Sequence, residues 1–133
     1  MPPELQTLRI IWFAFVASIT VFQIILLFMG LPQVAPEWTL GGIFAVCALG
    51  PAAFGVFGVP LFLRNTVAQS AFIVRFACFE SVAMFGFIAA IVANLPALSL
   101  GMAVVAWALL ASVFPTEERY TAWELRRLGE PDP

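Results

Sequence analysis

Four apolar stretches, each close to the length of a bilayer-crossing helix, limit the folds open to this chain. They cover about 10–30, 38–63, 70–93 and 97–114. A helix needs roughly 20 apolar residues to cross the hydrocarbon core of a membrane. Backbone N–H and C=O groups must find partners within the protein at that depth, which favours helices. The sequence therefore predicts an all-α, integral membrane four-helix protein.

Composition agrees with this class. Of the 133 residues, 62% are hydrophobic and 11% are charged, and the mean hydropathy is +1.02. A soluble domain carries roughly 25% charged residues to cover its surface. We expect one membrane domain over 1–133, built from two antiparallel helical hairpins. A polar tail at 116–133 follows the last span, and we expect a short surface helix or a solvated segment there.

Several classes of function are disfavoured by residues that the chain lacks. It has no His, so His-ligated haem and His-based catalytic triads are excluded. No nucleophile–base pair, metal-ligand cluster or phosphate-binding loop is present. We therefore expect no independent catalytic site, no metal and no cofactor. The net charge of −2 gives no reason to expect a nucleic-acid partner.

Arginine placement predicts the orientation in the membrane. With four spans, the N-terminus, the loop at 64–69 and the tail lie on one side, and the loops at 31–37 and 94–96 contain no Arg or Lys. The positive-inside rule then places both termini in the cytoplasm, and we expect a bacterial inner membrane. Arg75 and Trp123 are expected to anchor at the lipid headgroups. The arginines on the expected cytoplasmic side are Arg9, Arg64, Arg119, Arg126 and Arg127.

Small residues recur along the second span at spacings of four, three, four and three. Such spacing lays them along one helix face, and small faces let helices approach closely in lipid. We expect this face to pack against the third span, which has its own small residue at Gly86. Pro51 lies within the second span and is expected to kink it. The small residues of this face are Gly41, Ala45, Ala48, Ala52 and Gly55.

The third span carries Glu80 near its middle. A charge at the centre of a membrane helix costs roughly 2.5 to 3.5 kcal/mol on insertion scales, so an apolar setting favours the neutral acid. Arg75 points about 140° away around the helix, which disfavours a direct salt bridge. Two interpretations stay open. Glu80, helped by Ser81, exchanges H⁺ or Na⁺, or it is a neutral acid that holds helices together through a hydrogen bond.

Residues 41–93 resemble the proteolipid c subunit of rotary (F- and V-type) ATP synthases. The resemblance rests on the small-residue helix Gly41–Gly58, the loop that begins Arg64-Asn65, and the segment FACFESVAMFGFIAAIV around Glu80. It implies that Arg64 and Asn65 face a cytoplasmic partner and that Glu80 carries the ion. The chain departs from the family in having four expected spans, Thr66 where a Pro is usual, and the carboxylate in the third span.

Two functions follow as hypotheses. The first is a proteolipid-like, ion-translocating subunit that exchanges H⁺ or Na⁺ at Glu80. The second is a non-catalytic accessory or structural subunit of a larger membrane complex. A four-helix drug/proton antiporter fits less well, because such proteins often have little charge bias between the two sides. In each case we expect lipids as partners, together with either copies of the same chain or a larger complex.

Overall fold

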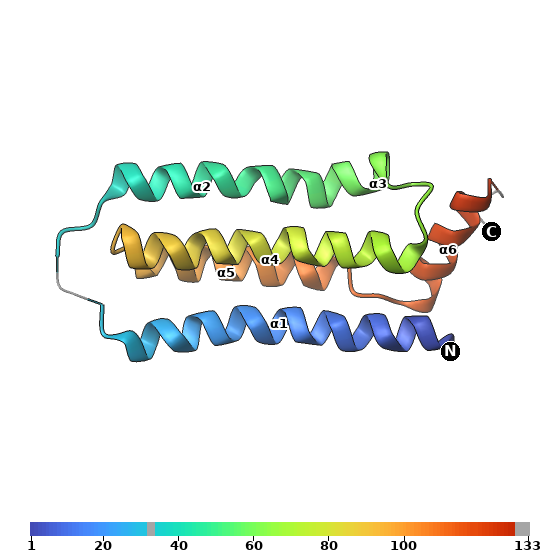
Figure 1. Ribbon diagram of the computed structural model, residues 1–133, viewed down its shortest axis with the longest axis horizontal. Coiled ribbons are helices and arrows are strands. Elements are labelled where there is room, and N and C mark those ends of the chain that lie inside the picture. Colours follow the sequence, from blue (N-terminus) through green and yellow to red (C-terminus); the bar gives the residue numbers. More distant parts are fainter. Residues whose placement is uncertain (32–33, 130–133) are drawn as a thin grey trace.

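The computed structural model describes residues 1–31 and 34–129, and this part of the chain is helical without any strand (Figure 1). The all-α prediction is therefore confirmed. Pro32 and Gln33 in the first loop, and residues 130–133 of the predicted tail, lie outside the described residues. The elements in chain order are α1 (Pro3–Met29), α2 (Trp38–Ala53), the π-helical turn η1 (Phe54–Gly58), α3 (Val59–Phe62), α4 (Ala68–Val92), α5 (Pro96–Ser112) and α6 (Glu117–Leu128).

Three helical segments of the described chain are long and apolar enough to cross a membrane. They are α1, the continuous run of α2, η1 and α3 from Trp38 to Phe62, and α4. Helix α5 has 17 residues and is followed by α6 at a bend of 72°. Counted together, α5 and α6 make a fourth candidate. Length and composition thus agree with a membrane protein of three to four spanning helices.

Helix α4 is the centre of the bundle. Helices α1, α2 and α5 all pack against it, and α1 also packs against α5. Its large side chains Phe76 and Phe79 are fully buried. Aromatic pairs join it to α1, where the ring centroids of Phe15 and Phe76 lie 6.0 Å apart. The core therefore lies around α4.

The predicted pair of hairpins is right for α4 with α5 and wrong for α1 with α2. Helices α1 and α2 lie on opposite sides of α4 (Figure 1). The connection of residues 30–37 can span roughly 25 Å when extended. Two successive helix contacts need only roughly 16–20 Å, so the connection is long enough to pass around α4. Helices α1 and α2 follow each other in the chain but lie on opposite sides of α4 instead of forming a hairpin.

Two polar contacts tie α1 to α5. Gln23 Nε2 donates to Ser99 Oγ at 3.1 Å, and Ser99 is fully buried. Trp12 Nε1 donates to the Leu110 carbonyl at 2.8 Å. Hydrogen bonds of this kind between membrane helices contribute roughly 0.6 to 2 kcal/mol each. They fix the position of α1 along α5.

The first helix begins at Pro3, before the predicted start of the first span at about residue 10. Proline is well tolerated in a first helical turn, and Glu4 there interacts favourably with the helix dipole. Leu5 and Leu8 are fully buried. These two leucines pack into the bundle and so stabilise the additional helical turns. The polar residues around them made this packing hard to predict from the sequence.

A helix in the tail is confirmed, and it folds back over the end of the bundle. Thr116 Oγ1 caps its start by accepting from the Arg119 N–H at 3.3 Å. Glu124 Oε1 accepts from the Ala68 N–H, at the first residue of α4, at 2.6 Å. A carboxylate at a helix N-terminus is stabilised by the helix dipole. Burial, with a smaller effect of Glu124, raises the pKa of Tyr120.

The small-residue face of the second span packs against α4 and the turn after it, as predicted. A Cβ on Gly55 would lie 2.5 Å from Phe79 Cε1, and one on Gly41 would collide with the Leu95 side chain. The remaining members of the face are Ala48, which is buried, and Ala45 and Ala52, which are half-buried.

Gly86 was expected on the same interface, and that expectation was wrong. A Cβ there would lie 2.8 Å from Met102 Cβ and 3.1 Å from Ser99 Cα, so Gly86 packs against α5. The tight turn around Asn94, whose φ is 53°, returns the chain directly along α4 and brings α5 onto that face.

We expect Gly55→Leu to destabilise the fold by about 1–3 kcal/mol, because the added side chain overpacks the contact with Phe79. Gly42→Leu on the same helix is the matched control, since a Cβ at Gly42 meets nothing within 4 Å. Thermal unfolding of both variants in detergent measures the difference. Equal midpoints for Gly55→Leu and Gly42→Leu would contradict the packing described here.

Candidate functional site

Glu80 is the middle residue of the 25-residue helix α4. Its half-buried side chain borders an open depression of about 220 Å³ together with Ala14 and Phe15 of α1. Within residues 1–31 and 34–129 the carboxyl group has no hydrogen bond and no ion pair. A group of this polarity in an apolar helix needs a partner, so Glu80 is the best-placed candidate in the described chain for contact with something outside it.

Ser81 lies beside an open apolar strip of α4. Val74, Met84 and Ile91 form this strip and are 37%, 44% and 40% exposed. The Ser81 hydroxyl donates to the Ala77 carbonyl at 2.8 Å, one helical turn earlier. The hydroxyl proton of Ser81 is therefore already donated within the helix. Ser81 could assist Glu80 in ion binding, as predicted, only by accepting a hydrogen bond or a cation at its hydroxyl oxygen.

Arg75 forms the main polar contact between α4 and the second span. Its Nε donates to the Gly55 carbonyl at 2.8 Å. The sequence explains why this carbonyl is free. The Val59 N–H bonds to the Phe54 carbonyl in the widened π-helical turn, and the next donor would come from Pro60, which has no N–H. Arg75 supplies the missing donor from the neighbouring helix.

This contact gives Arg75 a partner that the sequence did not predict. Its Nε binds a carbonyl inside the bundle, and contact of its side chain with lipid headgroups stays a prediction. Trp123 likewise donates its indole N–H to the Thr66 carbonyl at 3.0 Å, because α6 folds back over the loop. The expected absence of an Arg75–Glu80 salt bridge agrees with the structure.

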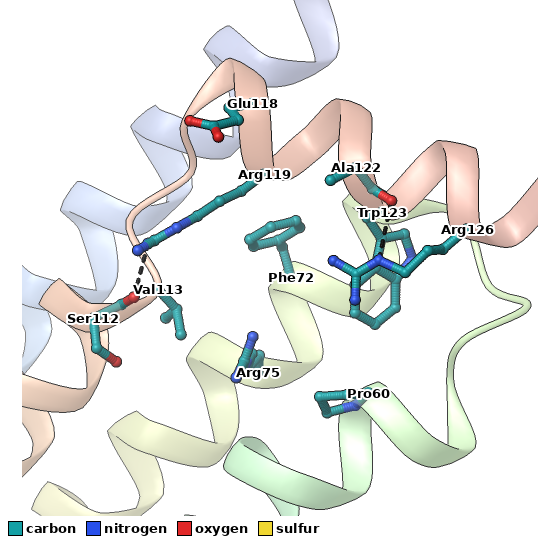
Figure 2. Close-up of a pocket in the computed structure, with 10 residues that line it drawn as sticks. All are labelled: Pro60, Phe72, Arg75, Ser112, Val113, Glu118, Arg119, Ala122, Trp123 and Arg126. Carbon is teal, nitrogen blue, oxygen red and sulfur yellow. Dashed lines mark hydrogen bonds between the residues drawn. The ribbon is translucent and has the colours of Figure 1, made fainter. Parts of the chain in front are cut away.

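The arginines lie toward one end of the molecule, where Figure 1 shows the start of α1 and helix α6. A cavity of about 690 Å³ lies there between α4, α5 and α6, and Figure 2 shows its lining. Arg119 Nη1 donates to the carbonyls of Ser112 at 2.7 Å and Phe114 at 3.2 Å. The sequence predicts that these arginines lie on one side, but the cavity depends on the direction of α6. The charged residues that line it are Arg75, Arg119, Arg126 and Glu118.

Arg64 and Asn65, which the resemblance assigns to a partner contact, are both exposed in the loop between α3 and α4. Arg64 also borders a small pocket with Trp123 and Arg126. The loop is therefore accessible, while α6 covers its far side. Contact with a partner stays a prediction.

The described residues contain no group of three or more His, Cys, Asp or Glu side chains that would hold a metal ion. Cys47 and Cys78 are both free thiols. The site that the described structure offers is therefore a single carboxyl group at Glu80, with the arginine cavity as a separate feature.

We expect Arg75→Leu to lower the free energy of unfolding by about 1–3 kcal/mol, since it leaves the Gly55 carbonyl without a donor. Pro60→Ala restores an N–H to the helix, so the same Arg75→Leu change should cost clearly less in that background. A double-mutant cycle of thermal unfolding in detergent measures the coupling. A cost that is the same in both backgrounds would show that Arg75 does not replace the proline's missing donor.

No protein family, characterised protein or solved structure compared with this chain gives a match.

Proposed function

We propose that this chain is a four-span membrane protein that exchanges H⁺ or Na⁺ at Glu80, as an ion-translocating subunit of an oligomer or of a larger complex. The single observation that supports the proposal most is Glu80 itself. It is the middle residue of the central helix, it borders an open depression, and it has no partner within the described chain.

The fourth span of this proposal is α5. Its 17 residues extend roughly 25 Å, near the lower limit for crossing a bilayer. It carries no charged residue, and the bend after Ser112 turns α6 away from its axis. All the arginines of the chain then lie toward the end that bears the start of α1 and helix α6, and that end is proposed to be cytoplasmic.

The chemistry follows from the cost of burying charge. A carboxyl group in an apolar environment gains from binding a proton or a cation, because an uncompensated charge is costly there. Glu80 lies next to the open strip at Ser81, so a partner subunit or an aqueous path that covers this strip would reach the carboxyl group. The resemblance to the c subunit over 41–93 agrees with this role and motivates the choice of H⁺ or Na⁺.

The second candidate function is a non-catalytic accessory subunit in which Glu80 hydrogen-bonds to another chain. One observation favours it. Helix α6 is hydrogen-bonded to Thr66 and Ala68, next to the Arg64-Asn65 loop. A loop held in this way has less freedom to engage a rotating partner than a bare hairpin loop has. The two candidates differ in whether Glu80 must ionise.

The proposed topology predicts opposite accessibility at the two ends of the molecule. In a Cys47→Ala, Cys78→Ala background, Glu117→Cys and Glu37→Cys each place one thiol at an exposed position. A membrane-impermeant maleimide applied from the outside should label Glu37→Cys in intact cells and should label Glu117→Cys only after lysis. Equal labelling of both variants in intact cells would contradict the four-span arrangement.

Glu80→Gln keeps the size and hydrogen-bonding capacity of the side chain and removes its ionisation. We expect the protein to assemble normally and to lose ion exchange in proteoliposomes of the native complex. A hydrophobic carbodiimide should modify Glu80, measured by mass spectrometry of the labelled peptide, because such reagents attack protonated carboxyl groups in apolar surroundings. Protection by added Na⁺ would identify Na⁺ as the ion.

Glu37→Gln is the matched control. Glu37 is exposed at the end of the molecule opposite the arginines, so this variant should keep full ion exchange. Full exchange by Glu80→Gln, together with no carbodiimide modification of the unaltered protein, would rule out the ion-exchange function. That result would leave the accessory subunit as the remaining candidate.

A further inference from the structure

The arginine cavity has the size and charge of a ligand site, and neither candidate function uses it. Its volume of about 690 Å³ falls within the roughly 300–1,000 Å³ typical of small-molecule sites. Arg75, Arg119 and Arg126 line it together with one acid, Glu118, so the lining carries a net charge of +2. Figure 2 shows Arg75 on α4 and Arg126 on α6, while Arg119 of α6 extends toward the Ser112 carbonyl.

Arg75 and Arg119 are not neutralised by the described protein. Neither makes a salt bridge to a carboxylate within residues 1–31 and 34–129. Their positive charges act unfavourably on each other, and each guanidinium binds only backbone carbonyls. A guanidinium has five N–H donors, so both retain donors beyond those in use. An anion in the cavity would offset positive charge there and accept hydrogen bonds from the remaining N–H groups.

We propose that this cavity binds a phosphate group, presented by an anionic phospholipid headgroup. Arginine pairs well with phosphate because its planar fork donates two parallel hydrogen bonds to the phosphate oxygens. Phe72, Val113 and Trp123 line the same cavity and offer an apolar wall for the glycerol and upper acyl chain of a lipid. A free phosphate would use the arginines alone.

The choice of a lipid rests on the membrane location proposed above, whereas the phosphate site itself does not. The cavity lies at the arginine end, which the proposed topology places at the cytoplasmic headgroups. Phosphate binding measured in detergent is independent of ion exchange at Glu80. Failure of this inference is thereby distinguishable from failure of the proposed function.

The first experiment measures phosphatidylglycerol retention by the full chain. The protein is reconstituted into phosphatidylcholine nanodiscs that contain a minor fraction of phosphatidylglycerol, and native mass spectrometry counts the lipids released with it. We expect Arg119→Gln to weaken retention about tenfold, the typical effect of losing one charge-assisted hydrogen bond. Arg127→Gln is the matched control on the same helix, because Arg127 pairs with Glu124 outside the cavity.

A gain-of-binding variant guards against loss of fold. Glu118→Gln removes the one negative charge of the lining from an exposed side chain, and we expect it to strengthen retention. Arg75→Gln is a less suitable variant, since Arg75 also supports the Gly55 carbonyl. Retention that is unchanged in both Arg119→Gln and Glu118→Gln would overturn the lipid site.

The second experiment separates the lipid from a soluble source. Delipidated protein in an uncharged detergent is titrated with inorganic phosphate by equilibrium dialysis. If phosphatidylglycerol retention depends on Arg119 and millimolar phosphate does not displace the lipid, the lipid headgroup is supported as the ligand. If inorganic phosphate binds in an Arg119-dependent way but the lipid is not retained, the cavity is still a phosphate site and the lipid assignment is overturned. Absence of both overturns the proposal as a whole.

Discussion

Close packing around α4 is the constraint on which the rest of the structure depends. One helix accepts three neighbours, so each of its faces must match a different partner. Gly55 lets the second span approach Phe79, and Gly86 lets α5 approach through Met102 and Ser99. In an apolar medium the gain comes from contact between surfaces, because lipid tails are as apolar as the side chains they would replace. Small residues at these points are therefore required by the architecture.

Three polar side chains in the described part of this apolar chain share a pattern that Glu80 does not follow, and the buried indole N–H of Trp107 also has no partner there. The side-chain N–H groups of Trp12, Arg75 and Trp123 each bind a backbone carbonyl on another segment. These bonds satisfy the donor and position the helices at once. Glu80 has no such partner among the described residues. The proposed role of Glu80 toward an ion or another subunit rests on this lack of a partner.

The arginine end of the molecule and the middle of α4 differ in chemistry. At the arginine end, α6 folds back and Glu124 caps the first residue of α4. Glu80 lies five residues beyond Arg75, roughly 7.5 Å along the helix axis from it. The cavity and the carboxyl group are thus features of the same helix at different depths. A lipid bound at the cavity would contact α4 at the level of Arg75 and leave the open depression beside Glu80 uncovered.

The helical class, the apolar segments and the unusual carboxylate were all readable in the sequence, because hydropathy and residue spacing act locally. The same is true of the small-residue face, since a periodicity in one helix depends on that helix alone. The neighbour of each face was decided by tertiary structure. Gly86 meets α5, and α1 lies across α4 from α2, because connection lengths permit several arrangements and packing selects one. Arg75 found its partner for a similar reason, since the free carbonyl at Gly55 exists only where a π-helical turn meets Pro60.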